Sequence, residues 1–310
     1  MTGGERAFFQ PRVFIPFAVI TLIWSSTWLV ITGQLGAVPP TWSVAYRFAI
    51  GSATMFVFAA LSGESLRIGR HGHWLAFAFG IPQFCLNYNS VYFAEQYVTS
   101  GLVAVVFALL LVPNSLLAWF FLGHRVSRRF VLGSLVAVAG VVLLFVQELG
   151  SSRAPPHNVL IGVGLAVLGV LSASVANIIQ ASEPLRVRSL PAMIAWGMAY
   201  GTAINAAVSM LFFGPPVFVP SAAYVAGLLY LGVIASALAF SLYFAVMREI
   251  GPGPAAYSSL IIPIIAMLLS TAFEGYRWSW LAVAGGALTL VGLFIALRAR
   301  RSEDEQTRAT

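Results

Sequence analysis

One charged side chain lies deep in an apolar segment of this chain, and it is Arg47. It stands six residues after Thr41, where the apolar segment begins. An arginine inside a membrane-spanning helix is energetically costly and usually functional, so Arg47 is a candidate for contact with a substrate carboxylate. Two structural alternatives stay open: the side chain can extend outward to the membrane surface, or it can donate to the carbonyls of a helix end.

Polar side chains recur at helical spacing in two further apolar segments. They are Gln83, Asn87 and Ser90 in the first segment, and Ser174, Asn177 and Gln180 in the second. Each set falls on one face of a helix, and polar groups in lipid favour the protein interior. These faces either join helices or line a cavity, and their presence in both halves of the chain favours a cavity. Uncharged amides suit a zwitterion or a neutral solute.

Aromatic residues form a third group that could contact a substrate. The members are Trp24 and Trp28, Tyr88 and Tyr92, Phe240 and Tyr243 with Met247, and Tyr257. Any one of them could instead pack in the core or face lipid. Together they suit an apolar or aromatic substrate side chain.

Acidic residues are missing from the middle of the apolar segments. All ten acids and all four histidines fall in connections, at segment edges or in the tails. Proton or sodium coupling usually uses an ionisable or oxygen-rich site at membrane depth, so we expect an uncoupled facilitator, with sodium binding by backbone carbonyls still open. Deep His, Asp or Glu clusters that would indicate an enzyme are missing too. The single cysteine, Cys85, forms no internal disulfide, and we expect neither a metal nor a cofactor.

Composition determines which elements must position these side chains. Of the 310 residues, 59% are hydrophobic and 9% are charged, against about 25% charged in an average soluble domain. The chain is therefore expected to be an all-α integral membrane protein, and a spanning helix needs about 20 apolar residues. We expect ten transmembrane helices: Val13–Ile31, Thr41–Leu61, His73–Phe93, Val98–Phe121, Phe130–Val146, Val159–Gln180, Leu190–Phe213, Ser221–Val246, Pro254–Phe273 and Trp278–Leu297.

Arginine placement predicts the orientation. All 17 basic residues are arginines, and 14 of them fall in one set of alternate connections while two fall in the other. Cytoplasmic loops carry the excess of basic residues, so both termini are expected in the cytoplasm. The arginines are spread over six separate places and form no basic stripe, so we expect no nucleic-acid partner.

Two halves of the chain share a pattern. Six residues of the first half recur 152 positions later: Phe121, Gly123, Arg125, Ser127, Gly133 and Gly140 correspond to Phe273, Gly275, Arg277, Ser279, Gly285 and Gly292. The tripeptide Tyr92-Phe93-Ala94 recurs 151 positions later. Chance matches among Gly and Ala are the alternative. We expect residues 1–12 as a cytoplasmic tail, 13–150 as a first five-helix repeat, 151–297 as a second, inverted repeat, and 298–310 as a cytoplasmic tail.

Inverted repeats are typical of transporters that work by alternating access. Two prolines, Pro113 and Pro263, lie in the middle of predicted spans, and Gly253 lies at the start of the ninth span. These residues are candidates for gates or hinges. For the prolines, the alternative is a static kink in the helix. The paired glycines are expected to let helices approach closely.

The chain resembles the drug/metabolite transporter superfamily, of the EamA type. The resemblance rests on Trp24-Ser-Ser-Thr-Trp28, Arg47-Phe48, Pro113, the stretch from Tyr230 to Gly251, and Pro263. Within the superfamily the chain is most similar to the YddG-type exporters of aromatic amino acids and methionine. It departs from the family at Gly123-His124-Arg125, where the family often has Gly-Glu-Arg.

These observations predict a bacterial inner-membrane exporter of small amphipathic solutes, above all aromatic and other apolar amino acids (Trp, Phe, Tyr and Met). Its partners would be the solute and the lipid bilayer, and short connections make a monomer plausible. The alternative is a proton-coupled multidrug or metabolite exporter, which would need a carboxylate in the membrane. A channel, a membrane-embedded enzyme and a structural scaffold are the rival classes.

Overall fold

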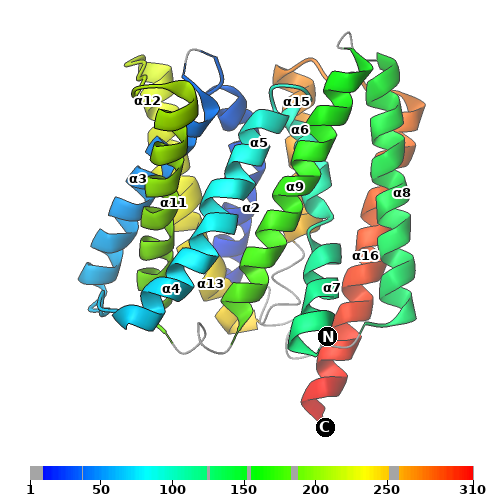
Figure 1. The fold of residues 1–310 in the computed structure, drawn as a ribbon. Helices are drawn as coiled ribbons and strands as arrows, with labels where there is room; N and C mark the ends of the chain where they lie inside the picture. Colours follow the sequence, from blue (N-terminus) through cyan, green and yellow to red (C-terminus); the bar gives the residue numbers. More distant parts are fainter. Residues whose placement is uncertain are drawn as a thin grey trace. The chain divides into compact units, whose positions relative to one another are not determined.

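The computed structural model describes residues 10–36, 38–123, 126–151, 155–182, 188–250 and 258–309, and the regular elements in these ranges are all helices (Figure 1). They are α2 (Pro11–Thr32), α3 (Pro40–Leu61), α4 (Gly69–Gly80), η1 (Ile81–Asn87), α5 (Tyr88–Ala94), α6 (Ser100–Ala108), α7 (Leu111–Leu122), α8 (Arg128–Ser151), α9 (Pro156–Ala181), α11 (Leu190–Phe213), α12 (Ala222–Leu229), η2 (Tyr230–Leu238), α13 (Ala239–Ile250), α15 (Ser258–Phe273) and α16 (Trp280–Ala309). The labels η1 and η2 denote π-helices.

Helices occupy the described part of each of the ten predicted segments. Eight helical stretches among the described residues are long and apolar enough to cross a membrane. The stretch Gly69–Ala94 falls outside that set, and Ser258–Phe273 has only 16 described residues. The all-helical class is confirmed, while ten crossings and cytoplasmic termini stay predictions.

Contacts divide the chain into two compact units, each built from both halves of the sequence. Unit 1 comprises Met1–Leu29, Tyr97–Val163 and Leu242–Thr310, and unit 2 comprises Val30–Gln96 and Gly164–Ser241. The compact units therefore differ from the two predicted sequence repeats. Each unit is described separately below.

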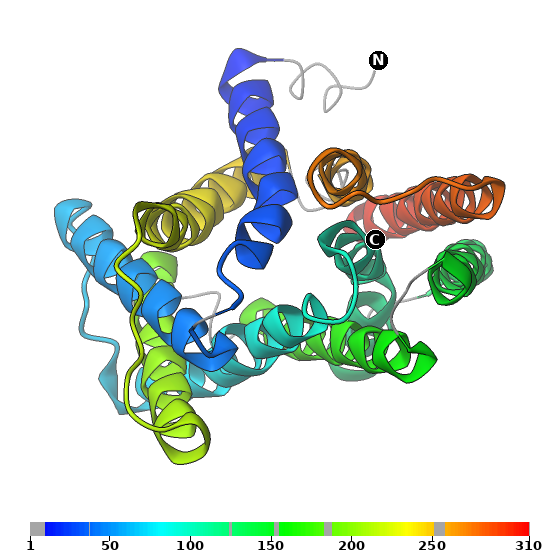
Figure 2. The same cartoon turned by 90° about the horizontal axis from the view of Figure 1, so that it is seen from above.

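In unit 1, α8 and α16 pack side by side through glycines, as both views show (Figures 1 and 2). A Cβ on Gly285 would stand 2.8 Å from the Gly140 carbonyl oxygen, and a Cβ on Gly133 would stand 2.8 Å from that of Gly292. The pairing of 133 with 292 and of 140 with 285 is antiparallel. The prediction that these glycines allow close helix approach is confirmed.

The helix ends of unit 1 repeat as the sequence does. Ser127 and Ser279 each accept a hydrogen bond from the backbone N–H three residues later, at 3.2 and 3.1 Å, which is the N-cap arrangement. Gly123 and Gly275, also 152 positions apart, both have a left-handed backbone, with φ of 70° and 72°. A residue without Cβ takes this conformation at little cost, which explains glycine at both positions.

Pro113 interrupts its span and Pro263 does not. Between α6 and α7, Leu109 and Leu110 form a turn whose N–H groups bond three residues back. The proline ring at position 113 clashes with the carbonyl four residues earlier, at Leu109, which accounts for the break. Pro263 is buried inside the continuous helix α15. Gly253 lies outside the described residues.

In unit 2, the two π-helices occupy equivalent places. Shifting η1 by the 151 positions that relate Tyr92 to Tyr243 places it on residues 232–238, inside η2. Each π-helix packs closely against a neighbouring helix through a glycine. Gly80, which directly precedes η1, packs against the Gly197 backbone of α11. Gly232 in η2 packs against the Arg47 carbonyl of α3. A side chain at either glycine would push the helices apart.

Helix α16 continues to Ala309, through most of the residues predicted as the C-terminal tail, 298–310. The cytoplasmic location of this segment stays a prediction. Of the predicted N-terminal tail, residues 1–12, helix α2 already includes Pro11 and Arg12, and residues 1–9 lie outside the described residues.

Candidate substrate-binding site

Arg47 is the most buried charged side chain of the described protein, with 1% of its surface exposed. It lies in the second turn of α3, and its Nε donates a 3.3 Å hydrogen bond to the Ser236 hydroxyl of η2. That hydroxyl in turn donates to the Leu231 carbonyl within the π-helix. The arginine therefore neither extends to the surface nor binds the carbonyl at a helix end.

Aromatic rings surround the guanidinium. Its central carbon stands 4.3 Å from the ring centroid of Tyr88 and 5.3 Å from that of Phe48, distances at which a cation is attracted to a ring face. Phe84 packs on Phe48 at 4.9 Å, and Phe240 packs on Phe84 at 6.3 Å. The predicted residues Arg47, Tyr88 and Phe240 thus belong to one aromatic cluster.

One polar atom of Arg47 has no partner. Its buried NH1 makes no hydrogen bond within the part of the chain that the structure describes. A buried donor without an acceptor is costly, more so when the group is charged. An acceptor brought by a ligand would remove that cost.

The helix whose Tyr88 ring lies beside Arg47 carries two tyrosines and then an acid on one face. Tyr88, Tyr92 and Glu95 stand at i, i+4 and i+7, which is one face of a helix. Tyr92 is fully buried and lies within electrostatic range of both Arg47 and Glu95. Glu95, 7% exposed, accepts a 2.9 Å hydrogen bond from Thr32.

The sequence correctly predicts Glu95 at the edge of its span, but it did not indicate that the side chain is buried. The residue directly follows α5, at the edge of its span as expected. Its side chain nevertheless points into unit 2, because the i+7 position continues the buried face of Tyr88 and Tyr92. The i, i+4, i+7 spacing of these three residues is the signal that could have identified it.

The polar face formed by Gln83 and Asn87 of η1 and by Ser90 of α5 is buried, as predicted. Gln83, Asn87 and Ser90 are 8%, 4% and 5% exposed, and the Asn87 side-chain oxygen has no hydrogen-bond partner among the described residues. In the second polar segment Ser174 is buried, whereas Asn177 and Gln180 on α9 are half-buried.

A further amide pair was missed by the sequence reasoning. Asn89 donates to the Asn205 side-chain oxygen at 2.7 Å, and Asn205 donates to the Phe84 carbonyl of η1 at 2.9 Å. Asn89 also donates to the Cys85 carbonyl at 2.8 Å. These bonds tie the π-helix to α11 and hold its backbone in place.

Trp24 and Tyr243 meet in unit 1. Their ring centroids are 5.1 Å apart, beside a buried cluster of Val13, Phe17, Ile20 and Val246. Both residues are half-buried. The structure thus joins Trp24 with Tyr243 in one unit, and Arg47, Tyr88, Tyr92 and Phe240 in the other. Tyr257 lies outside the described residues.

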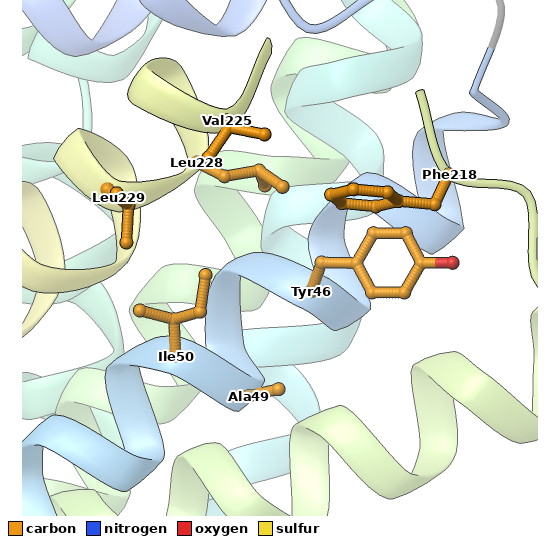
Figure 3. Close-up of a pocket in the computed structure, with 7 residues that line it drawn as sticks. All are labelled: Tyr46, Ala49, Ile50, Phe218, Val225, Leu228 and Leu229. Carbon is orange, nitrogen blue, oxygen red and sulfur yellow. The ribbon is translucent and has the colours of Figure 1, made fainter. Parts of the chain in front are cut away.

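A separate groove in unit 2 contains none of the predicted site residues. It has a volume of about 220 Å³ and is lined by Tyr46, Ala49, Ile50, Phe218, Val225, Leu228 and Leu229 (Figure 3). Phe218 and Leu229 are exposed. The lining is apolar, so this groove offers nothing to bind the charged groups of an amphipathic solute.

Comparison with known families identifies the chain. The model of the EamA-like transporter family matches residues 14–146 and again residues 160–298. The chain belongs to the EamA-like transporter family. The first match lies within the first predicted repeat, and the second runs from within the second predicted repeat to one residue beyond its end. The resemblance to this branch of the drug/metabolite transporters is confirmed. A membrane-embedded transporter of small molecules follows from the family.

Several relatives of this EamA-like transporter cover most of its length. Protein PagO of Salmonella typhimurium is 24% identical over 93% of both chains. A probable amino-acid metabolite efflux pump of the same organism is 23% identical over 92% of this chain and 95% of its own. The aromatic amino acid exporter YddG of Ancylobacter novellus is 28% identical over 64% of this chain and 66% of its own.

A solved crystal structure has the same fold. It superposes with a TM-score of 0.68 at 24% identity, and the match covers 94% of this EamA-like transporter and 98% of the other chain. At that identity the likeness establishes the fold alone.

Proposed function

We propose that this protein exports aromatic and other apolar amino acids (Trp, Phe, Tyr and Met) across the bacterial inner membrane. The observation that carries the proposal is the buried Arg47, whose NH1 has no partner and whose guanidinium lies over aromatic rings. A carboxylate is the strongest acceptor for a guanidinium, and the rings favour an apolar side chain. The names of two relatives, an aromatic amino acid exporter and an amino-acid metabolite efflux pump, support the same substrate class.

Transport would proceed by alternating access without ion coupling. Gln83, Asn87, Asn177 and Gln180 would orient the polar groups of the substrate, and Trp24, Tyr88, Tyr92, Phe240, Tyr243 and Tyr257 would contact its side chain. Pro113, Pro263 and Gly253 would supply the bends that let the helices move. The protein would work as a monomer with both termini in the cytoplasm.

Uptake into liposomes tests the proposal. Purified protein should take up labelled Trp and Phe saturably, with counterflow, in the absence of any ion gradient. Counterflow distinguishes a carrier from a channel. Strict dependence on a proton gradient would overturn the uncoupled mechanism, and failure to transport any neutral amino acid would overturn the substrate class.

The alternative is a proton-coupled multidrug or metabolite exporter. The buried carboxylate of Glu95 favours it, because a carboxylate held away from water is the group that such coupling requires. Apolar cations should then be carried against their gradient when the interior of the liposome is made acidic. The uncoupled exporter should show no such accumulation.

A further inference from the structure

We propose that the phosphate of an anionic phospholipid binds at one end of unit 2, at a basic segment formed by Arg67, Arg70 and Arg188. The acyl chains of the lipid would extend along helix α4 past Trp74. This site is separate from Arg47 and does not depend on which substrate the protein exports.

Arg188 joins the segment before α11 to the start of α4, at one end of unit 2 (Figure 1). Its NH1 donates a 2.7 Å hydrogen bond to the carbonyl of Ile68, the residue directly before α4. Gly72 leaves room for this guanidinium, since a Cβ there would stand 2.9 Å from the same nitrogen. A second bond fixes the segment, because Trp196 donates to the Leu66 carbonyl at 3.0 Å. The Nε of the arginine has no hydrogen-bond partner among the described residues.

Two exposed arginines flank the carbonyl that holds this guanidinium. Arg67 lies one residue before Ile68 and Arg70 lies two residues after it, and both are exposed. Three arginines therefore meet at one short segment of backbone. The nearest acid along the chain is the exposed Glu64, and residues 65–94 contain none. A phosphate matches such a segment in charge, and the planar fork of a guanidinium binds phosphate oxygens in pairs.

The residues that follow along α4 indicate a lipid rather than a soluble anion. Trp74 stands one turn after Arg70 on the same helix face and is 67% exposed. Ala78, one turn further, is exposed as well. The face thus changes from guanidinium to indole to methyl, as a bilayer changes from headgroup to acyl chain, and tryptophan favours the boundary between them. Basic groups between membrane helices bind anionic headgroups.

Retention of lipid by the purified protein tests the proposal. The protein is reconstituted with equal amounts of phosphatidylglycerol and phosphatidylcholine, extracted into mild detergent, and the lipids that stay bound are counted by native mass spectrometry. The unaltered protein should retain phosphatidylglycerol in preference to phosphatidylcholine. The double variant Arg67→Gln, Arg70→Gln should lower retention of phosphatidylglycerol at least about fivefold, since one arginine beside an anionic headgroup changes affinity by about that factor.

The double variant Arg128→Gln, Arg129→Gln is the matched control. These two arginines are also exposed and also begin a helix, α8, but they lie in unit 1. The control removes the same charge and should leave retention of phosphatidylglycerol unchanged. An equal loss in both double variants would mean diffuse attraction to positive charge and would overturn the proposal.

Three further measurements keep the outcome clear. Both double variants should melt at the temperature of the unaltered protein in phosphatidylcholine alone, because the substituted side chains are exposed. Equal retention of the two lipids by the unaltered protein would contradict a site for anionic lipid. Displacement of phosphatidylglycerol by inorganic phosphate at the same concentration would assign the arginines to a free anion instead. Since no substrate is needed for these measurements, their failure would leave the proposed function untouched.

Discussion

Gly285→Ala should destabilise the packing of α8 on α16, and its neighbour provides the control. A Cβ at position 285 would lie 2.8 Å from the Gly140 carbonyl oxygen and 3.0 Å from both Cγ and N of Leu144, whereas a Cβ at Gly286 would meet nothing within 4 Å. Ordinary contact begins near 3.4 Å, so the helices must separate by about 0.6 Å at this point, and overpacking of this kind costs about 1–3 kcal/mol.

The two variants gain the same helix propensity and lose the same freedom in the unfolded chain, so their difference isolates the overpacking. A difference of about 2 kcal/mol corresponds to about a 30-fold change in the folded to unfolded ratio. Denaturation of the purified protein in detergent, followed by tryptophan fluorescence, would measure it for Gly285→Ala and Gly286→Ala. The reasoning is refuted if Gly285→Ala is as stable as Gly286→Ala.

Three further predictions concern the site, the π-helix and the orientation. Arg47→Lys should lower Phe uptake by liposomes at least about tenfold although it keeps the charge, because an ammonium lacks the planar fork that meets both Ser236 and a carboxylate; normal uptake would argue against a paired contact. Asn205→Ala should destabilise the protein by about 1–3 kcal/mol, since it leaves the Phe84 carbonyl and the Asn89 amide without this partner. Thr54→Ala, which loses only a bond to its own helix, should cost less in the same denaturation assay. In a Cys85→Ser background, an impermeant maleimide applied to intact cells should label Val217→Cys and spare Ser65→Cys, and the reverse pattern would contradict cytoplasmic termini.

Elements dominated by apolar runs were predictable from the sequence alone. The span predicted at Leu190–Phe213 has the same bounds as α11, because Ser189 caps its first turn and Gly214 follows its end. The π-helices were not predictable. A π-turn differs from an α-turn by one step in hydrogen-bond register, and here Asn205, far along the chain, supplies a bond to the π-helical backbone.

The candidate site was predictable by residue type and less so by arrangement. Arg47, Tyr88 and Phe240 come together as expected from their polarity and aromatic character. Which residues share a unit could not be read from spacing, because each compact unit combines segments from both sequence halves. The burial of Glu95 was hidden for a related reason: exposure at a helix end depends on the neighbouring segments, here α2 with Thr32.

The matching positions of η1 and η2 have a consequence for the history of the molecule. A π-turn arises when one residue is inserted into an α-helix, and the family model matches this chain twice. Two independent insertions at one equivalent place would be a coincidence, whereas a single insertion before gene duplication yields both at once. The widened turn would then be an ancestral trait, older than the joining of the two halves, and a present-day protein with a single five-helix unit should carry it in its third helix.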